Sequence, residues 1–332
     1  MGNKKALVIG INYKGTGNDL RGCINDAINV SAMLKNSYQF TDITLLTEQD
    51  ATTAGIKQHL AEFVRGAVPG DTLYFHYSGH GSQIRDINTD EIDGYDEIIC
   101  PYDLNWKDKV ITDDDLKSYF NQVPNGVNLT AVLDCCHSGS GIDQQEEYES
   151  DPQPVIATKQ ALDVNVEGSR YLPPPPEVLE QIGDMYPKIR TVQSRDVNKT
   201  SLLICGCEDT QTSADALIDG SFQGAATASL IKAVRDAKGN ITYRQLIDTM
   251  NSFMKTNGFT QRPELNGPRK LYDHNFLASW VDDVEPSPLP VEPVVDQAPT
   301  SSLLDSVKNF KTPLMIGGII AAFIVIVYLF AN

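Results

Sequence analysis

Short apolar segments alternate with segments of helical periodicity along most of the chain, and this alternation limits the folds open to it. Continuous apolar runs are typical of strands that are buried on both faces of a parallel sheet. The predicted strands are 6–11, 43–47, 72–77, 129–134 and 201–205, and the predicted helices are 27–34, 52–64, 113–120, 225–234 and 243–255. Strands and helices in this order predict an α/β sandwich with a mainly parallel sheet, in which ligands bind at the carboxyl ends of the strands.

Composition narrows the classes of function. The 332 residues include 27 Lys and Arg against 44 Asp and Glu, which gives a formal net charge of −17. Because no basic patch offsets this acidity, we expect no nucleic-acid partner, and cationic substrates or divalent cations are favoured instead. Six irregularly spaced cysteines, without zinc-type spacing, indicate a reducing compartment rather than a disulfide framework.

The C-terminal end of the chain has the composition of a membrane anchor. Residues 313–331 form an uncharged run of 19 residues, which as a helix spans about 28 Å, close to the thickness of the hydrocarbon core. A buried core helix is the alternative, and the lack of a polar face disfavours it. We expect a transmembrane anchor at 312–332 after a Pro-rich stalk at 285–311, for which an SH3-type ligand is the alternative. The lysines before the anchor predict a single-pass protein whose remaining chain is cytoplasmic.

A long break separates the strand and helix signals into two groups. No periodic pattern spans 144–198, and an insertion of that length within a domain is usually functional or disordered. The break is acidic at its start and includes four consecutive prolines at 173–176. Its basic residues are Lys159, Arg170, Lys188, Arg190 and Arg195.

Two predicted strands lead into loops that carry groups suited to thiol catalysis. The strand at 72–77 runs into a glycine-flanked histidine, His80, and the strand at 129–134 runs into Cys135 and Cys136. If these strands are parallel neighbours, both loops emerge at one sheet edge, where an imidazole can take the proton of a thiol nucleophile. Either residue type alone is more often structural, but the conjunction favours a catalytic pair. The spacing leaves open which cysteine attacks.

Three motifs resemble those of the metacaspases, the caspase-like cysteine peptidases of clan CD. They are His-Tyr-Ser-Gly-His-Gly-Ser-Gln at 76–83, Asp-Cys-Cys-His-Ser-Gly-Ser at 134–140, and the segment 206–216. The resemblance implies a caspase-like three-layer sandwich with a mainly parallel six-stranded sheet, and a monomer. It further implies a type I-like arrangement without a prodomain, with a p20-like catalytic region at 1–143, a linker at 144–198 and a p10-like region at 199–284.

The resemblance also implies the roles of the catalytic groups. It makes Cys136 the nucleophile and His80 the general base and acid, with Cys135 as a structural neighbour. The backbone N–H groups of Gly81 and Cys136 would form the oxyanion hole.

A pocket for a basic side chain follows from the same resemblance. It places Asp26 and Asp134, together with Ser78, in the S1 pocket that holds the residue before the scissile bond. Carboxylates in such a pocket select Arg or Lys by charge pairing. The alternative for Asp26, without the resemblance, is an acid that stabilises a helix N-terminus. The basic residues of the 144–198 break then become candidate self-cleavage sites.

An acidic loop follows the predicted catalytic histidine. Six acids fall within residues 86–97, but Glu91 occupies the position where an EF-hand needs glycine, and no helix pair flanks the loop. We therefore exclude an EF-hand, and a solvated acidic loop is the simplest alternative. The resemblance instead implies Ca²⁺ as cofactor, ordering the active-site loops. Its implied ligands are Asp96, Asp113, Asp114 and Asp143.

These observations combine into one hypothesis with two competitors. We expect a membrane-anchored, calcium-stimulated cysteine endopeptidase that cleaves protein or peptide substrates after Arg or Lys and processes itself in the linker. A catalytically inactive, membrane-tethered scaffold is the first competitor, and the complete set of catalytic, pocket and calcium residues argues against it. The second is another thiol hydrolase, such as an isopeptidase, which activity on short arginyl peptides would separate.

Overall fold

A six-stranded sheet forms the centre of the protein. The computed structural model describes residues 2–85, 95–135, 164–180, 201–208 and 211–280, and all structural statements concern these. The sheet order is β12-β9-β7-β3-β1-β2, and every neighbouring pair is parallel except β12 and β9. The prediction of a mainly parallel six-stranded sheet is confirmed. The strands are β1 (Lys4–Gly10), β2 (Asp42–Thr47), β3 (Thr72–Ser78), β7 (Asn128–Asp134), β9 (Ser201–Cys205) and β12 (Glu264–Asn266).

The central strands are apolar throughout because both of their faces are covered. All seven residues of β3 and all seven of β7 are buried. Alternate side chains of each strand enter different core clusters: Tyr74 and Val132 belong to one, and Phe75 and Leu133 to the other. Burial on both faces is what the continuous apolar runs predict.

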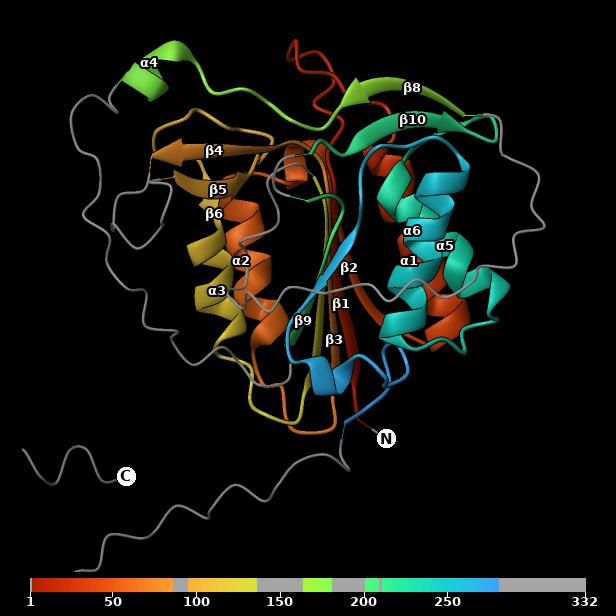
Figure 1. The fold of residues 1–332 in the computed structure, drawn as a ribbon. Helices are drawn as coiled ribbons and strands as arrows, with labels where there is room; N and C mark the ends of the chain where they lie inside the picture. The colour runs from red at the N-terminus through yellow and green to blue at the C-terminus, as the bar shows by residue number, and fades with distance from the viewer. Residues whose placement is uncertain (1, 86–94, 136–163, 181–200, 209–210, 281–332) are drawn as a thin grey trace, which may run out of the picture. The chain divides into compact units, whose positions relative to one another are not determined.

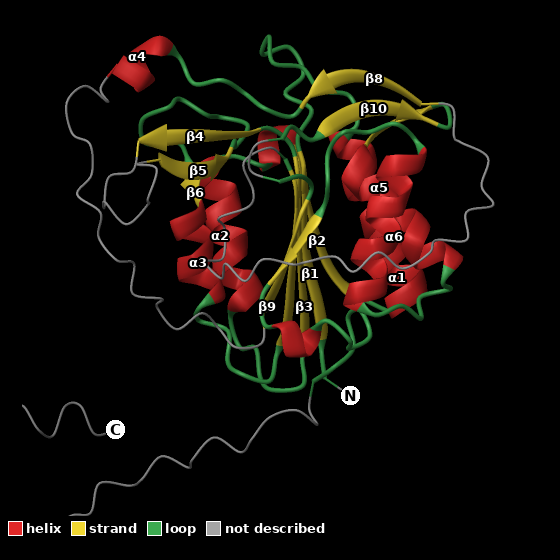
Figure 2. Ribbon diagram, in the orientation of Figure 1, coloured by secondary structure: helices red, strands yellow, loops and turns green. Residues whose placement is uncertain are grey.

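Helices cover both faces of the sheet and make it the middle of three layers (Figures 1 and 2). On one face lie α1 (Cys23–Tyr38), α5 (Ala225–Asp236) and α6 (Tyr243–Thr256), and on the other lie α2 (Thr53–Val64) and α3 (Asp113–Phe120). Threonines start three of these helices: Thr52 accepts from a first-turn N–H of α2, and Thr112 and Thr242 form capping boxes at α3 and α6.

Two small sheets lie at the carboxyl ends of the central strands, near the top of Figure 1. One has the order β4-β5-β6 and the other β11-β10-β8. The sequence pattern did not predict these strands, nor β8 and α4 within the 144–198 break. The strands are β4 (Gly81–Arg85), β5 (Tyr95–Ile99), β6 (Ile111–Thr112), β8 (Val164–Ser169), β10 (Ala214–Ile218) and β11 (Ser221–Gly224), and the short helix is α4 (Pro176–Glu180). Two 3₁₀ turns complete the elements, Glu48–Asp50 and Arg269–Leu271.

The two predicted regions of the catalytic body share one sheet. Strand β9, from the region 199–284, pairs with β7, from the region 1–143. The chain as a whole divides into the units Met1–Glu285 and Pro286–Asn332, and all the residues described belong to the first. The domain boundaries at 143 and 198 stay predictions.

The predicted membrane anchor requires a correction. Among the described residues, no helix combines the length and the apolar composition needed to cross a bilayer. This finding contradicts the transmembrane helix at 312–332, and with it the membrane partner and the single-pass localisation. The prediction rested on hydropathy alone, which does not establish that a segment forms the single helix of about 20 residues that a span needs. Both the stalk at 285–311 and the apolar run lie outside the described residues.

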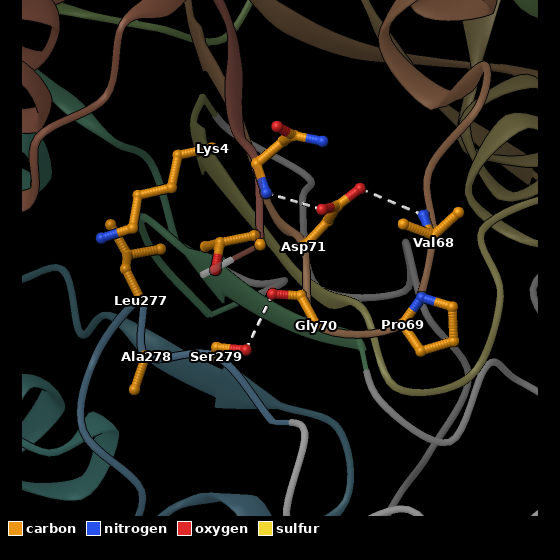
Figure 3. Close-up of a pocket in the computed structure, with 11 residues that line it drawn as sticks. Lys4, Val68, Pro69, Gly70, Asp71, Leu277, Ala278 and Ser279 are labelled. Atoms are coloured by element: carbon orange, nitrogen blue, oxygen red, sulfur yellow. Dashed lines mark hydrogen bonds between the residues drawn. The ribbon is translucent and has the colours of Figure 1, made fainter.

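A cavity of about 640 Å³ lies at the amino ends of β1 and β3 (Figure 3). Its polar groups bind each other: the Asp71 carboxylate accepts the N–H of Asn3 at 2.6 Å and of Val68 at 3.1 Å, and Ser279 Oγ donates to the Gly70 carbonyl at 2.7 Å. These bonds connect Asn3 and Ser279, which lie near the two ends of the unit Met1–Glu285, to the turn that precedes β3. The residues predicted to carry the chemistry lie at the opposite edge of the sheet.

Candidate active site

His80 is fixed in position directly after β3. Its backbone N–H donates to Tyr13 Oη at 3.1 Å, its carbonyl accepts from Tyr77 Oη at 2.7 Å, and its ring centroid lies 4.8 Å from that of Tyr13. The ring atom Nε2 lies 2.9 Å from the carbonyl oxygen of Asn18. Because a carbonyl only accepts hydrogen bonds, Nε2 carries the proton and Nδ1 is the basic nitrogen of the neutral ring.

The surroundings of His80 favour that neutral form. Burial lowers the pKa of His80, although the backbone carbonyls of Asn18 and Arg170 oppose the shift. Nδ1 is buried and makes no hydrogen bond within the described part of the chain. An unprotonated, positioned imidazole nitrogen is what a general base needs.

The predicted nucleophile, Cys136, lies outside the described residues, but the strand that leads to it is defined. Strands β3 and β7 are parallel neighbours, and Ser78 stands opposite Asp134 in their register. His80 and Cys136 each follow that pair by two residues. Cys135 is buried in the core, where its carbonyl oxygen lies 3.6 Å from Cys207 Sγ, as expected of a structural neighbour. The pairing of His80 with Cys136 stays a prediction.

The three residues predicted to form the S1 pocket converge on one arginine of the chain itself. The guanidinium of Arg170 lies 2.7 Å from Asp26 through Nη2 and 3.2 Å from Asp134 through Nη1, and Nη1 also donates to Ser78 Oγ at 2.7 Å. All four side chains are fully buried. Ser78 completes the set by donating its own proton to Asp26 at 2.7 Å. The chain therefore places a basic side chain where the sequence predicts that a substrate arginine binds.

Sequence reasoning missed a third carboxylate in this pocket. Asp215 on β10 lies 3.0 Å from Arg170 Nη2 and also accepts the backbone N–H groups of Arg21 and Gly22. The sequence signal for Asp215 was its position in the segment 206–216, one of the three motifs that carry the family resemblance. Gly224 was missed as well: its N–H donates to Asp26 at 3.0 Å, and a side chain there would overlap Asp134 and Arg170.

Charge in the pocket is balanced around the guanidinium. Burial raises the pKa of Asp26 to about 7, against the opposing pull of Arg170. Burial also acts to raise the pKa of Asp134, but Arg170 and the hydrogen bonds from Ser213 and Thr227 outweigh it, so that pKa is lowered. Desolvation disfavours the charge of Arg170, yet the surrounding carboxylates raise its pKa well above the ordinary value. The carboxylates of the pocket therefore stabilise one buried positive charge.

The backbone around Arg170 runs through the site as an extended strand. Strand β8, which ends at Ser169, pairs antiparallel with β10, and the Arg170 N–H donates to the Ser213 carbonyl at 2.9 Å. The Arg170 carbonyl then accepts the N–H of Gly81 at 2.9 Å, and Gly81 is the predicted oxyanion donor. In Figure 1 this segment crosses the top of the protein from β8 towards α4. A peptide added to a sheet edge in this way is a common mode of substrate binding.

Three of the four predicted calcium ligands are described. Asp96 lies on β5, and Asp113 and Asp114 begin α3; Asp96 and Asp113 are 5% exposed. Lys117 Nζ lies 2.8 Å from Asp113 Oδ2 and 3.8 Å from Asp114 Oδ1, and burial raises the pKa of Asp113 despite that cation. The described residues hold no group of three side chains able to bind a metal, and Asp143 lies outside them.

At one edge of the sheet, a pocket of buried carboxylates holds an arginine of an extended segment that passes the predicted base and the predicted oxyanion donor. This is the arrangement expected of a peptidase. Residues 4–145 match the family model described as metacaspase, peptidase C14 domain. The chain is 34% identical over 295 residues to Metacaspase-1 of Pyricularia oryzae, covering 82% of this chain and 74% of that protein. It belongs to the metacaspases, a family of C14 cysteine peptidases.

A second relative and a solved structure are also similar to this chain. Metacaspase-1B of Aspergillus niger is 33% identical over 288 residues, and the match spans 80% of this chain but 65% of that protein. The solved structure of protein GSU0716 from Geobacter sulfurreducens has a TM-score of 0.58 and 24% identity, covering 83% of this chain and 99% of that one. At this identity the likeness concerns the fold.

Proposed function

We propose that the chain is an endopeptidase that cleaves after Arg or Lys, using Cys136 as nucleophile and His80 as base and acid. One observation carries the proposal: Arg170 enters a pocket of three carboxylates while its carbonyl accepts the N–H of Gly81. Side chain and carbonyl thus contact the predicted pocket and the predicted oxyanion donor, which are the two contacts that cleavage after a residue needs. A scaffold would not require both contacts on one residue.

The reaction follows from these positions. His80 Nδ1 takes the proton of the Cys136 thiol, and the thiolate attacks the carbonyl carbon of the arginyl residue. The N–H of Gly81 stabilises the oxyanion, and the amine leaves with the proton from His80, which gives a thioester. Water then attacks the thioester, passes a proton to His80 and releases the carboxylic acid. His80 returns that proton to the sulfur, and the thiol is restored.

Self-processing is part of the proposal. Of the five basic residues in the 144–198 break, Arg170 is the one that the structure describes, and its bond to Tyr171 follows the carbonyl held by Gly81. Cleavage of this bond in the same chain would separate the two predicted regions. We assign Arg170 as the self-cleavage residue.

A test of the P1 preference uses the full chain and peptides that differ only at the residue before the scissile bond. We expect kcat/KM for Arg or Lys to exceed that for Asp or for citrulline, an uncharged analogue of arginine, by at least about 100-fold. The carboxylates give the pocket its preference for charge. Equal rates for Arg and citrulline would contradict the pocket assignment, and no hydrolysis of any peptide would favour the scaffold.

Calcium stimulation is proposed on the chemistry of the donor groups. Ca²⁺ prefers carboxylate oxygens, and Asp113 presents buried ones, of which Oδ1 has no hydrogen-bond partner in the described part of the chain. The described three, Asp96, Asp113 and Asp114, do not form a metal-binding group as they stand. The ion would therefore have to draw them together with Asp143, and its positive charge could order the adjoining loops in doing so.

Removing calcium is expected to lower kcat/KM for arginyl peptides by about tenfold or more, and Ca²⁺, but not Mg²⁺, should restore it. Asp113→Asn should raise the calcium concentration at half-effect about tenfold, as measured by activity and by titration calorimetry. Asp108→Asn is the control, since Asp108 is exposed and binds Asn105. An unchanged midpoint in Asp113→Asn would speak against this ligand set.

A further inference from the structure

The extended segment continues past Arg170 and is held by β4 on the other side of the scissile bond. Gly81 and Tyr171 form a parallel bridge, and the Leu172 N–H donates to the Gly81 carbonyl at 3.0 Å. Ser82 Oγ then donates to the Leu172 carbonyl at 2.5 Å. The first two residues of β4 therefore bind both polar backbone groups of the second residue after the scissile bond.

The side chains of this stretch are held as well. Leu172 packs against the core cluster that lies between the central sheet and helices α2 and α3, and Pro174 is buried. Helix α4, two residues further on, lies against β4. Figure 1 shows α4 above β4, at the end of the segment that starts from β8. The contacts thus extend well beyond the residues that the chemistry uses.

The position of β4 explains why it can take a peptide. It is an edge strand of the sheet β4-β5-β6, so one side of its backbone is open to pairing. The chain's own segment uses this edge at Gly81, while β10 binds the residues before Arg170. Peptide bond hydrolysis requires the pocket and the oxyanion donor, but it does not require Ser82.

We propose that Gly81 and Ser82 form a subsite for the leaving-group side of substrates, which selects an apolar side chain two residues after the scissile bond. The proposal rests on the proposed peptidase function, with the chain's own segment marking the path of a substrate. Ser82 Oγ is the group specific to this subsite, because its hydroxyl is aimed at the substrate backbone and Ser82 is fully buried. A substrate that has no residues after its leaving group lacks the backbone carbonyl to which Ser82 would donate.

Two substrates with the same arginyl sequence test the subsite on the full chain. One ends in an aminomethylcoumarin amide, and the other is an internally quenched peptide that continues with Tyr-Leu-Pro. Ser82→Ala should lower kcat/KM five- to tenfold for the extended peptide and less than twofold for the amide. Ser201→Ala is the matched control, since it is a buried serine whose hydroxyl makes no hydrogen bond in the described residues.

A substrate pair on the unmodified protein makes the test independent of how the variant folds. Replacing the leucine of the extended peptide by aspartate should lower kcat/KM by tenfold or more. Equal losses on both substrates in Ser82→Ala, no loss on either, or indifference to aspartate would each overturn the subsite. If the unmodified protein hydrolyses neither substrate, the proposed peptidase function itself fails, and the subsite with it.

Discussion

Replacing Cys136 by alanine is expected to reduce kcat/KM for arginyl peptides by about 10⁴-fold or more. The substitution removes the atom that forms the covalent intermediate, and members of a catalytic pair typically contribute effects of this size. His80→Ala should give a loss of the same order, and the double variant should lose little more, because the two side chains act as one unit. Initial rates on the amide substrate, with thermal melting as a check on folding, measure all three proteins.

The neighbouring cysteine provides the matched control. Cys135 is 1% exposed and lies in the core, so Cys135→Ala should keep kcat/KM within about threefold of the unmodified chain. The sequence spacing alone did not distinguish the two cysteines. If the large loss follows Cys135 instead, the assignment of the nucleophile is wrong, and if neither variant loses activity, thiol catalysis is wrong.

Arg170→Gln is expected to abolish cleavage between Arg170 and Tyr171, which mass spectrometry of the incubated chain detects as a fragment that begins at Tyr171. Glutamine keeps much of the side-chain length but cannot pair with three carboxylates. Arg170→Lys should retain the cut at a lower rate, because an ammonium supplies the charge without the planar fork. Lys188→Gln serves as control and should leave this particular cut unchanged. A persisting cut at this bond in Arg170→Gln would disprove the assignment.

The same residue should also control access to the pocket. In a Cys136→Ala background, which stays uncut, we expect a labelled arginyl peptide to bind at least tenfold more tightly when Arg170 is also replaced by Gln. A tethered arginine competes at an effective concentration of about millimolar or higher. Equal affinities in the two proteins would show that Arg170 does not block the substrate pocket.

Whether Arg170→Gln folds decides between two roles for the buried arginine, that of a bound substrate residue and that of a structural ion-pair partner. Without the guanidinium, Asp26, Asp134 and Asp215 would face each other, and they can relieve the repulsion by taking up protons and water. Asp26 already has a pKa near 7 through burial, so it is the first to do so. Global unfolding of Arg170→Gln would mean that the arginine is a structural ion-pair partner rather than a bound substrate residue.

The long apolar strands were the predictable part of the fold. Strands such as β3 and β7 are buried at every position, so their sequences carry a continuous apolar signal. The strands of the two small sheets are short, and β4 and β11 mix polar and apolar residues, which leaves little periodicity to detect. Strand β8 is held by pairing with β10 rather than by a local pattern. Such tertiary pairing is invisible in a single sequence.

The site residues that could be predicted from the sequence were those that lie in segments resembling the family. Asp26, Ser78 and Asp134 were proposed from the family resemblance, and the structure brings them together around one cation. Asp215 reaches the pocket from a strand that the pattern did not predict, and Arg170 was one of five equivalent basic residues until its position was known. Charge counting shows which residues can pair, but only the fold shows which of them do.

If substrates follow the path of the chain's own segment, the pairing of β8 with β10 implies that the enzyme selects among conformations as well as sequences. From Val164 to Leu172, nine residues lie extended, first as strand β8 beside β10 and then along the start of β4, a path of roughly 30 Å at about 3.3 Å per residue. An arginine within a stable helix cannot follow that path until the helix has opened, and the free energy of opening then adds to the barrier for cleavage. Most arginines on folded proteins would therefore be protected by their own secondary structure, and cleavage would be concentrated in chain segments that are already locally unfolded.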